Sequence, residues 1–417
     1  MAANTTTLDA ILKNDYLPPI RKALNDSSLL WSRLERDEES VVGKMAIVPI
    51  NYAHNQGVGA QSETGVPTAG EEAYKESQVA MKYIRGRISV SSPVIEASKN
   101  DAGAFVRAVD SEMRGLEASL RDDMNRQVFG DGTGKLAQVN GAVTWSSGTA
   151  TVTVDNPGTL YLKPGMLIDI YSSYPDTKSH SGVKVESVNS ATSFTISAGE
   201  GSAANIADNA WITRKGAVTT TGVQYEIMGL KGLIDDGTYV ATLQNIARST
   251  ASYWKANVLA NGGTNRALTL ELMQQAQDEA EVQGAGLTSL IVSNFAVRRK
   301  YINLLAADKR FVQPFYIEGG WPGLRPKEEG RRQYQAVEFN GIPYVADRYC
   351  PGNTMFFVDE STIKVYRLKD FDWMDEDGSI LHLKSGSAEY EAVLELFANL
   401  GIDAPLKNSV IRDISES

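Results

Sequence analysis

The chain has 417 residues, of which 42% are hydrophobic and 22% charged, a composition typical of a folded globular protein with two or three domains. Its 51 acidic and 41 basic residues give a net charge of −10, which argues against a nucleic-acid-binding surface because phosphate contacts require Lys and Arg. The single cysteine, Cys350, excludes an intrachain disulfide, and neither a secretory signal nor a membrane-spanning run of 18 apolar residues is expected.

The first elements are short. Residues 8–24 predict a helix that a Pro-Pro pair interrupts, and residues 29–34 predict a second helix with Ser27 or Ser28 as its N-cap. Residues 44–52 (KMAIVPINY) then read as a strand.

A polar arm follows this strand. Residues 53–73 are rich in glycine, and Val58 and Val66 are the largest apolar side chains within them. Residues 77–95 then alternate as a half-buried strand does, so the two strands and the arm together predict a long hairpin over 44–92. Because the arm has little apolar surface to bury in its own domain, we expect it to pack against a neighbouring copy of the chain.

One long amphipathic helix is predicted over residues 101–130. An apolar side chain recurs about every four residues, which is typical of a helix with one buried face. At 1.5 Å per residue the helix would span roughly 40 Å. The apolar stripe consists of Phe105, Val109, Met113, Leu116, Leu120, Met124 and Val128.

The composition changes over residues 137–215. Charged residues fall to 11 of 79, or about 14% against 22% overall, while Ser and Thr become frequent. Short alternating runs are separated by turn residues, a pattern that predicts a small antiparallel barrel or sandwich. We interpret this segment as a domain inserted into a larger α+β protein, because helical patterns resume after Gly216.

The last part of the chain mixes helices and strands. Residues 268–286 predict a helix with Thr269 as N-cap and Gly284 as its end, and Asn294 is a candidate cap for the next helix. The Asn340-Gly341 pair suits a type I′ hairpin turn. A long strand, EYEAVLELFANL, and a tail close the chain.

No pattern predicts a catalytic, cofactor or metal site, so we expect no enzyme. The histidines His54, His180 and His382 do not have the spacing of a metal set or a triad. The loop GDGTGK at 130–135 resembles a phosphate loop but lacks the required glycine spacing and the final Ser or Thr. An acidic run at 370–377 does not match an EF-hand and favours a solvated turn over a cation site.

The order of these elements resembles the major capsid proteins of tailed double-stranded DNA bacteriophages. The stretches VEFNGIPYVADRYCPGNTMFFVDESTIKVY (337–366) and EYEAVLELFANLGIDAPLKNSVIRDI (389–414) carry the resemblance most clearly. The second is similar to the family's aromatic-rich strand, which an Asn-Leu pair and a Pro-containing tail follow. The family has the Hong Kong 97-type phage capsid fold, an α+β architecture.

The resemblance implies a division of the chain into five parts. These are an N-terminal arm (1–43), an extended β-hairpin loop (44–92), a peripheral domain with a long spine helix (93–136 and 371–417), an inserted all-β domain (137–215) and an axial domain (216–370).

The implied function is that of a structural subunit. Hexamers and pentamers of one chain would build an icosahedral shell around double-stranded DNA, without sequence-specific contact, cofactor or membrane. The shell would belong to the virion and assemble in the bacterial cytoplasm. Because the chain begins almost directly with the N-terminal arm, the resemblance implies a separate scaffolding protein, or none, together with a portal.

Contacts between subunits are expected from charged residues of the arm, of the strand after it, of one helix and of one loop. These candidates are Glu63, Glu71, Glu72, Lys75, Lys82, Arg85, Arg87, Arg298, Arg299, Arg331 and Arg332. Some family members cross-link subunits through a Lys of the extended loop. Lys75 and Lys82 lie near that region, but no partner Asn or Glu matches, so this chemistry is not carried over.

Two alternatives remain open. A bacterial encapsulin-like compartment shell shares the fold and encloses enzymes instead of a genome. A hydrolase or adhesin with a β-rich accessory domain is a different class, which the missing catalytic constellation and the missing signal peptide disfavour.

Overall fold

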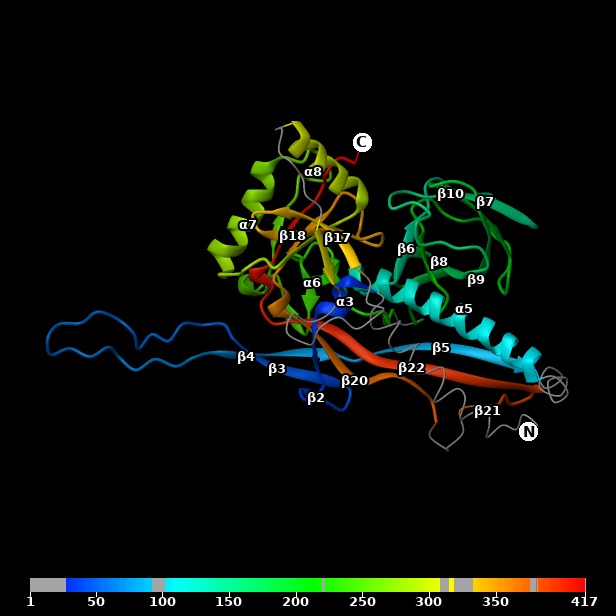
Figure 1. Ribbon diagram of the computed structural model, residues 1–417, viewed down its shortest axis with the longest axis horizontal. Helices are drawn as coiled ribbons and strands as arrows, with labels where there is room; N and C mark the ends of the chain where they lie inside the picture. Colours follow the sequence, from blue (N-terminus) through cyan, green and yellow to red (C-terminus); the bar gives the residue numbers. More distant parts are fainter. Residues whose placement is uncertain are drawn as a thin grey trace.

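The computed structural model describes residues 28–91, 102–219, 222–307, 315–318, 333–375, 380 and 382–416. The molecule is elongated, with a thin arm at one end and two compact units on one side of a long sheet (Figure 1). The helix expected at 8–24 lies outside the described residues. The second short helix is α3 (Leu29–Arg33), and Ser28 takes its N-cap position without a side-chain hydrogen bond.

The long sheet is built around β22 (Glu389–Ile402). One edge of β22 pairs with β20 (Ile363–Trp373) and then with β21 (His382–Leu383), and the other edge pairs with β5 (Lys82–Ser91) over ten residues. The short strand β1 (Glu35–Asp37) adds to β20 in parallel. The sheet therefore joins segments that lie about 300 residues apart in the sequence.

The long helix α5 (Ala102–Phe129) lies along this sheet, beside β5. Met113, Leu120, Met124 and Val128 are buried, and Leu116 is partly buried against the same core, which confirms the predicted spacing of about four residues along this face. The helix comes close to β5 at Gly86. A Cβ atom on Gly86 would lie 2.7 Å from the Cδ1 atoms of Leu116 and Leu120, so any side chain at this position would require these leucines to move.

The hairpin is shorter than the sequence predicts. The strand β3 (Met45–Asn51) pairs with β4 (Tyr74–Ala80), and β2 (Val41–Val42) adds to β3. The prediction of one hairpin over 44–92 is wrong beyond Ala80, because residues 82–91 form β5 and pair with β22.

The chain changes its pairing partner from β3 to β22 at the point where its buried face changes. Side chains are buried at positions 77, 79 and 81 and then at 84, 86, 88 and 90, so the buried face moves from odd to even positions. A shift of one residue turns every later side chain to the other side of a strand. The strand after Met81 is therefore buried on a different surface from the hairpin.

One compact unit is a six-stranded antiparallel sheet over residues 135–214, in the strand order β6-β11-β8-β9-β10-β7. A bridge between Val139 and Val154 joins the ends of β6 and β7, which closes the sheet into a barrel. Its interior is a separate apolar cluster that includes Val152, Ile170 and Phe194. The strands are β6 (Lys135–Gln138), β7 (Thr149–Thr153), β8 (Leu167–Ser173), β9 (Thr177–Val188), β10 (Ser193–Ser197) and β11 (Trp211–Arg214).

The other compact unit contains a seven-stranded mixed sheet in the order β14-β23-β19-β15-β18-β17-β16. Alternate side chains of its central strands divide between two cores. Ile291 and Phe357 pack with the helices, whereas Val292 and Phe356 join the main core of the molecule. The strands are β14 (Asn257–Leu259), β15 (Leu290–Ser293), β16 (Phe315–Glu318), β17 (Gln333–Phe339), β18 (Ile342–Ala346), β19 (Met355–Val358) and β23 (Ser409–Ile411).

The helices of this unit are α7 (Leu270–Gly284) and α8 (Phe295–Ala307). Both predicted caps are confirmed: Thr269 Oγ1 accepts a hydrogen bond from Leu272 N, and Asn294 Oδ1 accepts one from Val297 N. The helix α7 ends at Gly284 as predicted, and the left-handed conformation is taken by Ala285 after it.

The C-terminal tail differs from the expected division of the chain. We expected 371–417 to lie with the long helix, but β23 pairs with β14 and β19 of the seven-stranded sheet. Val410 and Ile411 are fully buried there, which fixes the tail in this unit. The remaining elements are α6 (Leu230–Leu233), β12 (Thr242–Leu243), β13 (Ile246–Ala247) and 3₁₀ turns at Ser252–Trp254, Glu360–Thr362 and Pro405–Lys407.

Candidate assembly surfaces

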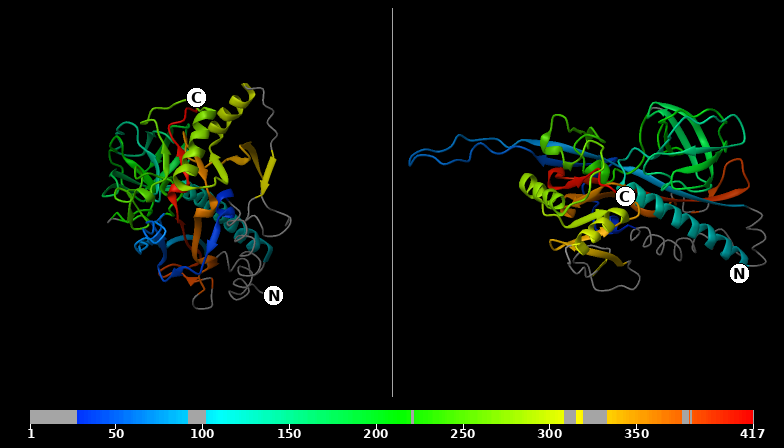
Figure 2. Two further views of the ribbon diagram at one scale, coloured as in Figure 1. Left: turned by 90° about the vertical axis from the view of Figure 1, so that its left-hand side faces the viewer. Right: turned by 90° about the horizontal axis from the view of Figure 1, so that it is seen from above.

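The arm between β3 and β4, residues 52–73, extends far beyond the rest of the molecule (Figure 2). Its two valines are almost fully exposed, Val58 at 84% and Val66 at 86% of their surface. The two halves of the arm touch at Gly70, where a Cβ atom would lie 2.5 Å from Gln56 N. Beyond Tyr52 the arm is therefore a thin ribbon whose side chains are exposed or only partly buried.

The base of the arm is attached to the body. The Tyr52 ring stacks on Tyr253, with ring centroids 5.1 Å apart and planes inclined by 14°. Further along the hairpin, the Ser77 hydroxyl and the side-chain amide of Gln244 form a hydrogen bond of 2.9 Å. These contacts set the direction in which the arm leaves the molecule.

The acidic candidates all lie on the arm. Glu63 and Glu71 are exposed, and Glu72 accepts hydrogen bonds from Asn51 and from the Tyr74 hydroxyl. Lys75 follows on β4 and is also exposed. Acidic side chains are thus available to another molecule along the arm.

The basic candidates of β5 have partners within the chain. Lys82 Nζ donates to the carbonyl oxygen of Gln224 at 2.7 Å, and burial lowers the pKa of Lys82 while the Glu226 charge opposes the shift. Arg85 pairs with Glu395 at 2.9 Å, and Arg87 pairs with Glu391 at 3.3 Å.

Both arginine side chains of β5 stay open to solvent. They are exposed over 58% and 62% of their surface, respectively. Lys82 is therefore an internal contact, whereas Arg85 and Arg87 remain accessible from outside.

The remaining candidates lie elsewhere. Arg298 on α8 has its guanidinium carbon 5.3 Å from the centroid of the half-exposed Phe295 ring, and Arg299 beside it is exposed. Arg331 and Arg332 lie outside the described residues. The structure thus distributes the candidates over three surfaces, namely the arm, the edge of β5 and α8, and does not gather them at one site.

The structure contains two buried ionic clusters that the sequence did not predict. In the first, Arg126 at the end of α5 donates to Glu226 at 2.8 Å and to Asp123 at 3.1 Å. Burial raises the pKa of Glu226, and the Arg126 charge opposes that shift. The Asp123/Arg126 spacing of three residues on a helix was the only local signal, since Glu226 is 100 residues away.

The second cluster centres on Asp235, which is fully buried. One carboxylate oxygen accepts from Arg412 at 2.7 Å, and the other accepts from Arg248 at 3.2 Å and from the backbone N–H groups of Gly237, Tyr239 and Val240. The cluster ties the C-terminal tail and the loop after α6 to the same point.

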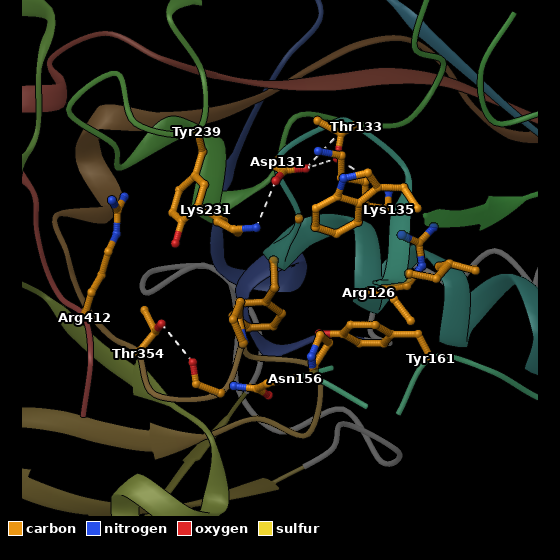
Figure 3. Close-up of a pocket in the computed structure, with 18 of the residues that line it drawn as sticks. Arg126, Asp131, Thr133, Lys135, Asn156, Tyr161, Lys231, Tyr239, Thr354 and Arg412 are labelled. Carbon is orange, nitrogen blue, oxygen red and sulfur yellow. Dashed lines mark hydrogen bonds and ion pairs between the residues drawn. The ribbon is translucent and has the colours of Figure 1, made fainter. Parts of the chain in front are cut away.

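A cavity of about 400 Å³ lies between these two clusters (Figure 3). It is bounded by the end of α5 and the loop after it, by the barrel, and by the tail. Lys231 Nζ reaches Asp131 across it at 2.9 Å, as the dashed line shows. The Lys135 ammonium lies 4.1 Å from the Trp211 ring centroid and 4.5 Å from that of Tyr174.

The described residues contain no group of three or more His, Cys, Asp or Glu side chains arranged for a metal ion. His180 stacks on Trp145 inside the barrel, and Asp370 pairs with Arg367 at 2.8 Å. In the same part of the chain, no helix is both long and apolar enough to cross a membrane.

The fold is similar to that of solved phage capsids. The Cyanophage A-1(L) capsid asymmetric unit aligns over 95% of this chain and 92% of that chain, with a TM-score of 0.52 and 15% identity. The capsid of Myoviridae Phage XM1 (91% and 90%, TM-score 0.44, 7% identity) and the holo-SrpI encapsulin complex from Synechococcus elongatus PCC 7942 (92% and 86%, TM-score 0.42, 7% identity) also align.

No family model and no curated protein matches the sequence. The similarity is therefore one of structure, and it shows that the chain has the α+β fold of the Hong Kong 97-type capsid proteins.

Proposed function

We propose that this chain is a major capsid protein, the subunit of an icosahedral shell that encloses the double-stranded DNA of a tailed bacteriophage. The arm is the observation that carries the proposal. It is long, projects away from the body, and exposes nearly all of its side chains. Ordering such a ribbon costs backbone entropy, on the order of 1 kcal/mol for each glycine relative to Ala. Beyond Tyr52 the side chains of the arm are exposed or only partly buried, so the subunit buries little apolar surface there to offset that cost.

A neighbouring copy can supply the missing contacts. The arm presents unpaired backbone groups between Tyr52 and Ala73, and it carries the carboxylates of Glu63, Glu71 and Glu72. Edge pairing between strands and charge contacts are common modes of such docking. The accessible Arg85 and Arg87 on β5 provide basic partners of the kind that the arm requires.

The division of the chain gives each part a role in this proposal. The sheet around β22 and helix α5 form the rigid body, the unit with α7 and α8 surrounds the capsomer axis, and the barrel is an accessory domain on the shell. The net charge of −10 supports packaging of DNA without sequence-specific contact, because an acidic lining does not retain the genome. A scaffolding protein, a portal and assembly in the bacterial cytoplasm belong to the same proposal.

The test is electron microscopy of the purified chain, expressed alone and together with a candidate scaffolding protein. Closed particles built from hexamers and pentamers are expected in at least one preparation. A chain that stays monomeric in both preparations at high protein concentration contradicts the proposal. Nuclease-protected DNA in particles from infected cells separates a genome shell from a compartment that encloses enzymes.

A further inference from the structure

The charges that line the cavity described above have the opposite balance to the chain as a whole. Its lining includes the basic residues Arg126, Lys135, Lys231 and Arg412 but a single carboxylate, that of Asp131. The whole chain has ten more acidic than basic residues, 51 against 41. A local excess of cations in an acidic protein indicates a site where negative charge is expected.

Two of these cations already have partners in the walls. Arg126 binds Glu226 and Asp123, and Arg412 binds Asp235. Both arginine side chains are only 8% exposed. They hold the walls in place and leave the two lysines to determine the charge of the opening.

Of the two lysines, only Lys231 pairs with the carboxylate of the cavity, which is already fully engaged. Asp131 Oδ2 accepts from Lys231 Nζ, while Oδ1 accepts from the backbone N–H and the hydroxyl of Thr133. Among the described residues Lys135 has no ion pair within 4.0 Å, and its ammonium lies over the faces of Trp211 and Tyr174. Lys135 is thus a half-buried cation without a direct ion-pair partner in the described part of the chain.

The titration of Lys135 agrees with this geometry. Burial lowers its pKa, the neighbouring Lys231 lowers it further, and Asp131 opposes both effects. A bound anion would relieve the repulsion between the two ammonium groups.

The loop that carries Lys135 is the GDGTGK segment. Gly132 and Gly134 have φ values of +74° and +76°, which residues with a side chain rarely adopt, and they fold the loop so that both Asp131 and Lys135 line the cavity. The segment lacks the spacing of a nucleotide-binding P-loop, so the lysine side chains and not a cradle of backbone N–H groups would hold the ligand.

We infer that this cavity binds a small multivalent anion, such as inorganic phosphate or pyrophosphate, between Lys135 and Lys231. Its volume of about 400 Å³ accommodates such an ion with water but not a DNA duplex. This inference does not depend on shell assembly, because all the side chains involved belong to one subunit.

The experiment titrates pyrophosphate into the full-length chain by isothermal calorimetry at constant ionic strength. One site per chain is expected, with affinity reduced at least tenfold in Lys135→Met. Methionine keeps the aliphatic contact with Trp211 and removes the charge, and circular dichroism confirms that the variant is folded. The matched control is Lys215→Met, which makes the same change of net charge at an exposed lysine that pairs with Glu200 on the barrel.

Equal affinity in the wild type, Lys135→Met and Lys215→Met overturns the inference, as does the absence of binding to the wild type. A further titration uses a short DNA duplex at the same phosphate concentration. Tighter binding of the duplex that is lost in Lys135→Met also overturns it, because the site would then bind a nucleic-acid backbone. Particle formation, scored by electron microscopy in the same samples, shows separately whether the capsid proposal holds.

Discussion

Asp235 and Arg248 form an ion pair in which both side chains are fully buried, with Arg248 Nη1 3.2 Å from Asp235 Oδ2. Arg248 also donates to the carbonyl oxygens of Gly232, Leu233 and Trp254. The guanidinium therefore holds the end of α6 and the loop after it against the segment before β14. The Arg248 side chain is fully buried.

Replacement of this arginine is expected to destabilise the protein strongly. Arg248→Met leaves the Asp235 carboxylate short of one donor and orphans several carbonyl oxygens, which should cost about 3–5 kcal/mol of unfolding free energy. Arg87→Ala, which breaks an exposed pair on β5, should cost about 0–1 kcal/mol. Urea unfolding of both variants measures the contrast, and similar losses would show that the buried cluster is unimportant.

Gly86 is expected to resist even the smallest side chain. In Gly86→Ala the new methyl group would lie 2.7 Å from Leu116 and Leu120 of α5, so we expect a loss of about 1–3 kcal/mol from overpacking. Leu120→Ala creates space at the same point. A double-mutant cycle by urea unfolding should therefore show that Gly86→Ala costs less in the Leu120→Ala background, whereas strict additivity would contradict the contact.

Asp347 should make stability depend on pH. Burial raises the pKa of this carboxyl, although a hydrogen bond from Tyr349 N opposes the shift. The folded state therefore binds the proton more tightly than the unfolded state, and stability falls as pH rises from the unfolded value of 3.8 through the folded pKa.

Asp347→Asn cannot ionise and removes this dependence. Its melting temperature relative to the wild type should increase from pH 4 to pH 7 in differential scanning calorimetry. A difference between variant and wild type that is the same at both pH values would refute the assignment. Asp208→Asn at an exposed site of the barrel is a suitable control.

The barrel should fold without the rest of the chain. Its core is separate from the main core, and the bridge between Val139 and Val154 closes it. Residues 134–216 expressed alone should give a dispersed amide NMR spectrum and a cooperative thermal transition. A collapsed spectrum would show that the barrel depends on contacts such as that of the Tyr161 hydroxyl with Tyr349 O.

Local signals in the sequence predicted the elements that depend on neighbouring residues. The stripe through Met113 and Met124 defines the buried face of α5, and the side chains of Thr269 and Asn294 begin their helices by binding backbone N–H groups one turn ahead. The positive φ values at Asn340 and Gly341 likewise follow from the residue types that a tight hairpin turn favours.

Features that join distant segments could not be predicted in this way. The buried positions change from odd to even after Met81, which marks the end of the hairpin, but the partner of the following strand is known only from its pairing with β22. Likewise, Val410 lies in the seven-stranded sheet because β23 pairs with the distant strands β14 and β19, which no local pattern predicts. The cavity near Lys135 is lined by residues of α5, the barrel, the region of α6, the loop before β19 and the tail. The local sequence around Lys135 therefore showed only that a standard phosphate loop is absent.

The most direct measurement compares sedimentation and negative-stain images of the wild-type chain with those of a deletion of residues 57–70. The deletion joins chain ends that already touch, because Gly70 lies against the backbone of Gln56. A second variant replaces the same residues by a Gly-Ser stretch of equal length. This variant separates the effect of the arm's side chains from the effect of its length.

The wild type should sediment as closed shells, whereas both variants should remain folded and soluble, with unchanged circular dichroism, and fail to build stable shells. Shells of normal yield and heat resistance from the deletion variant would contradict the assignment of the arm as the contact that assembles the capsid.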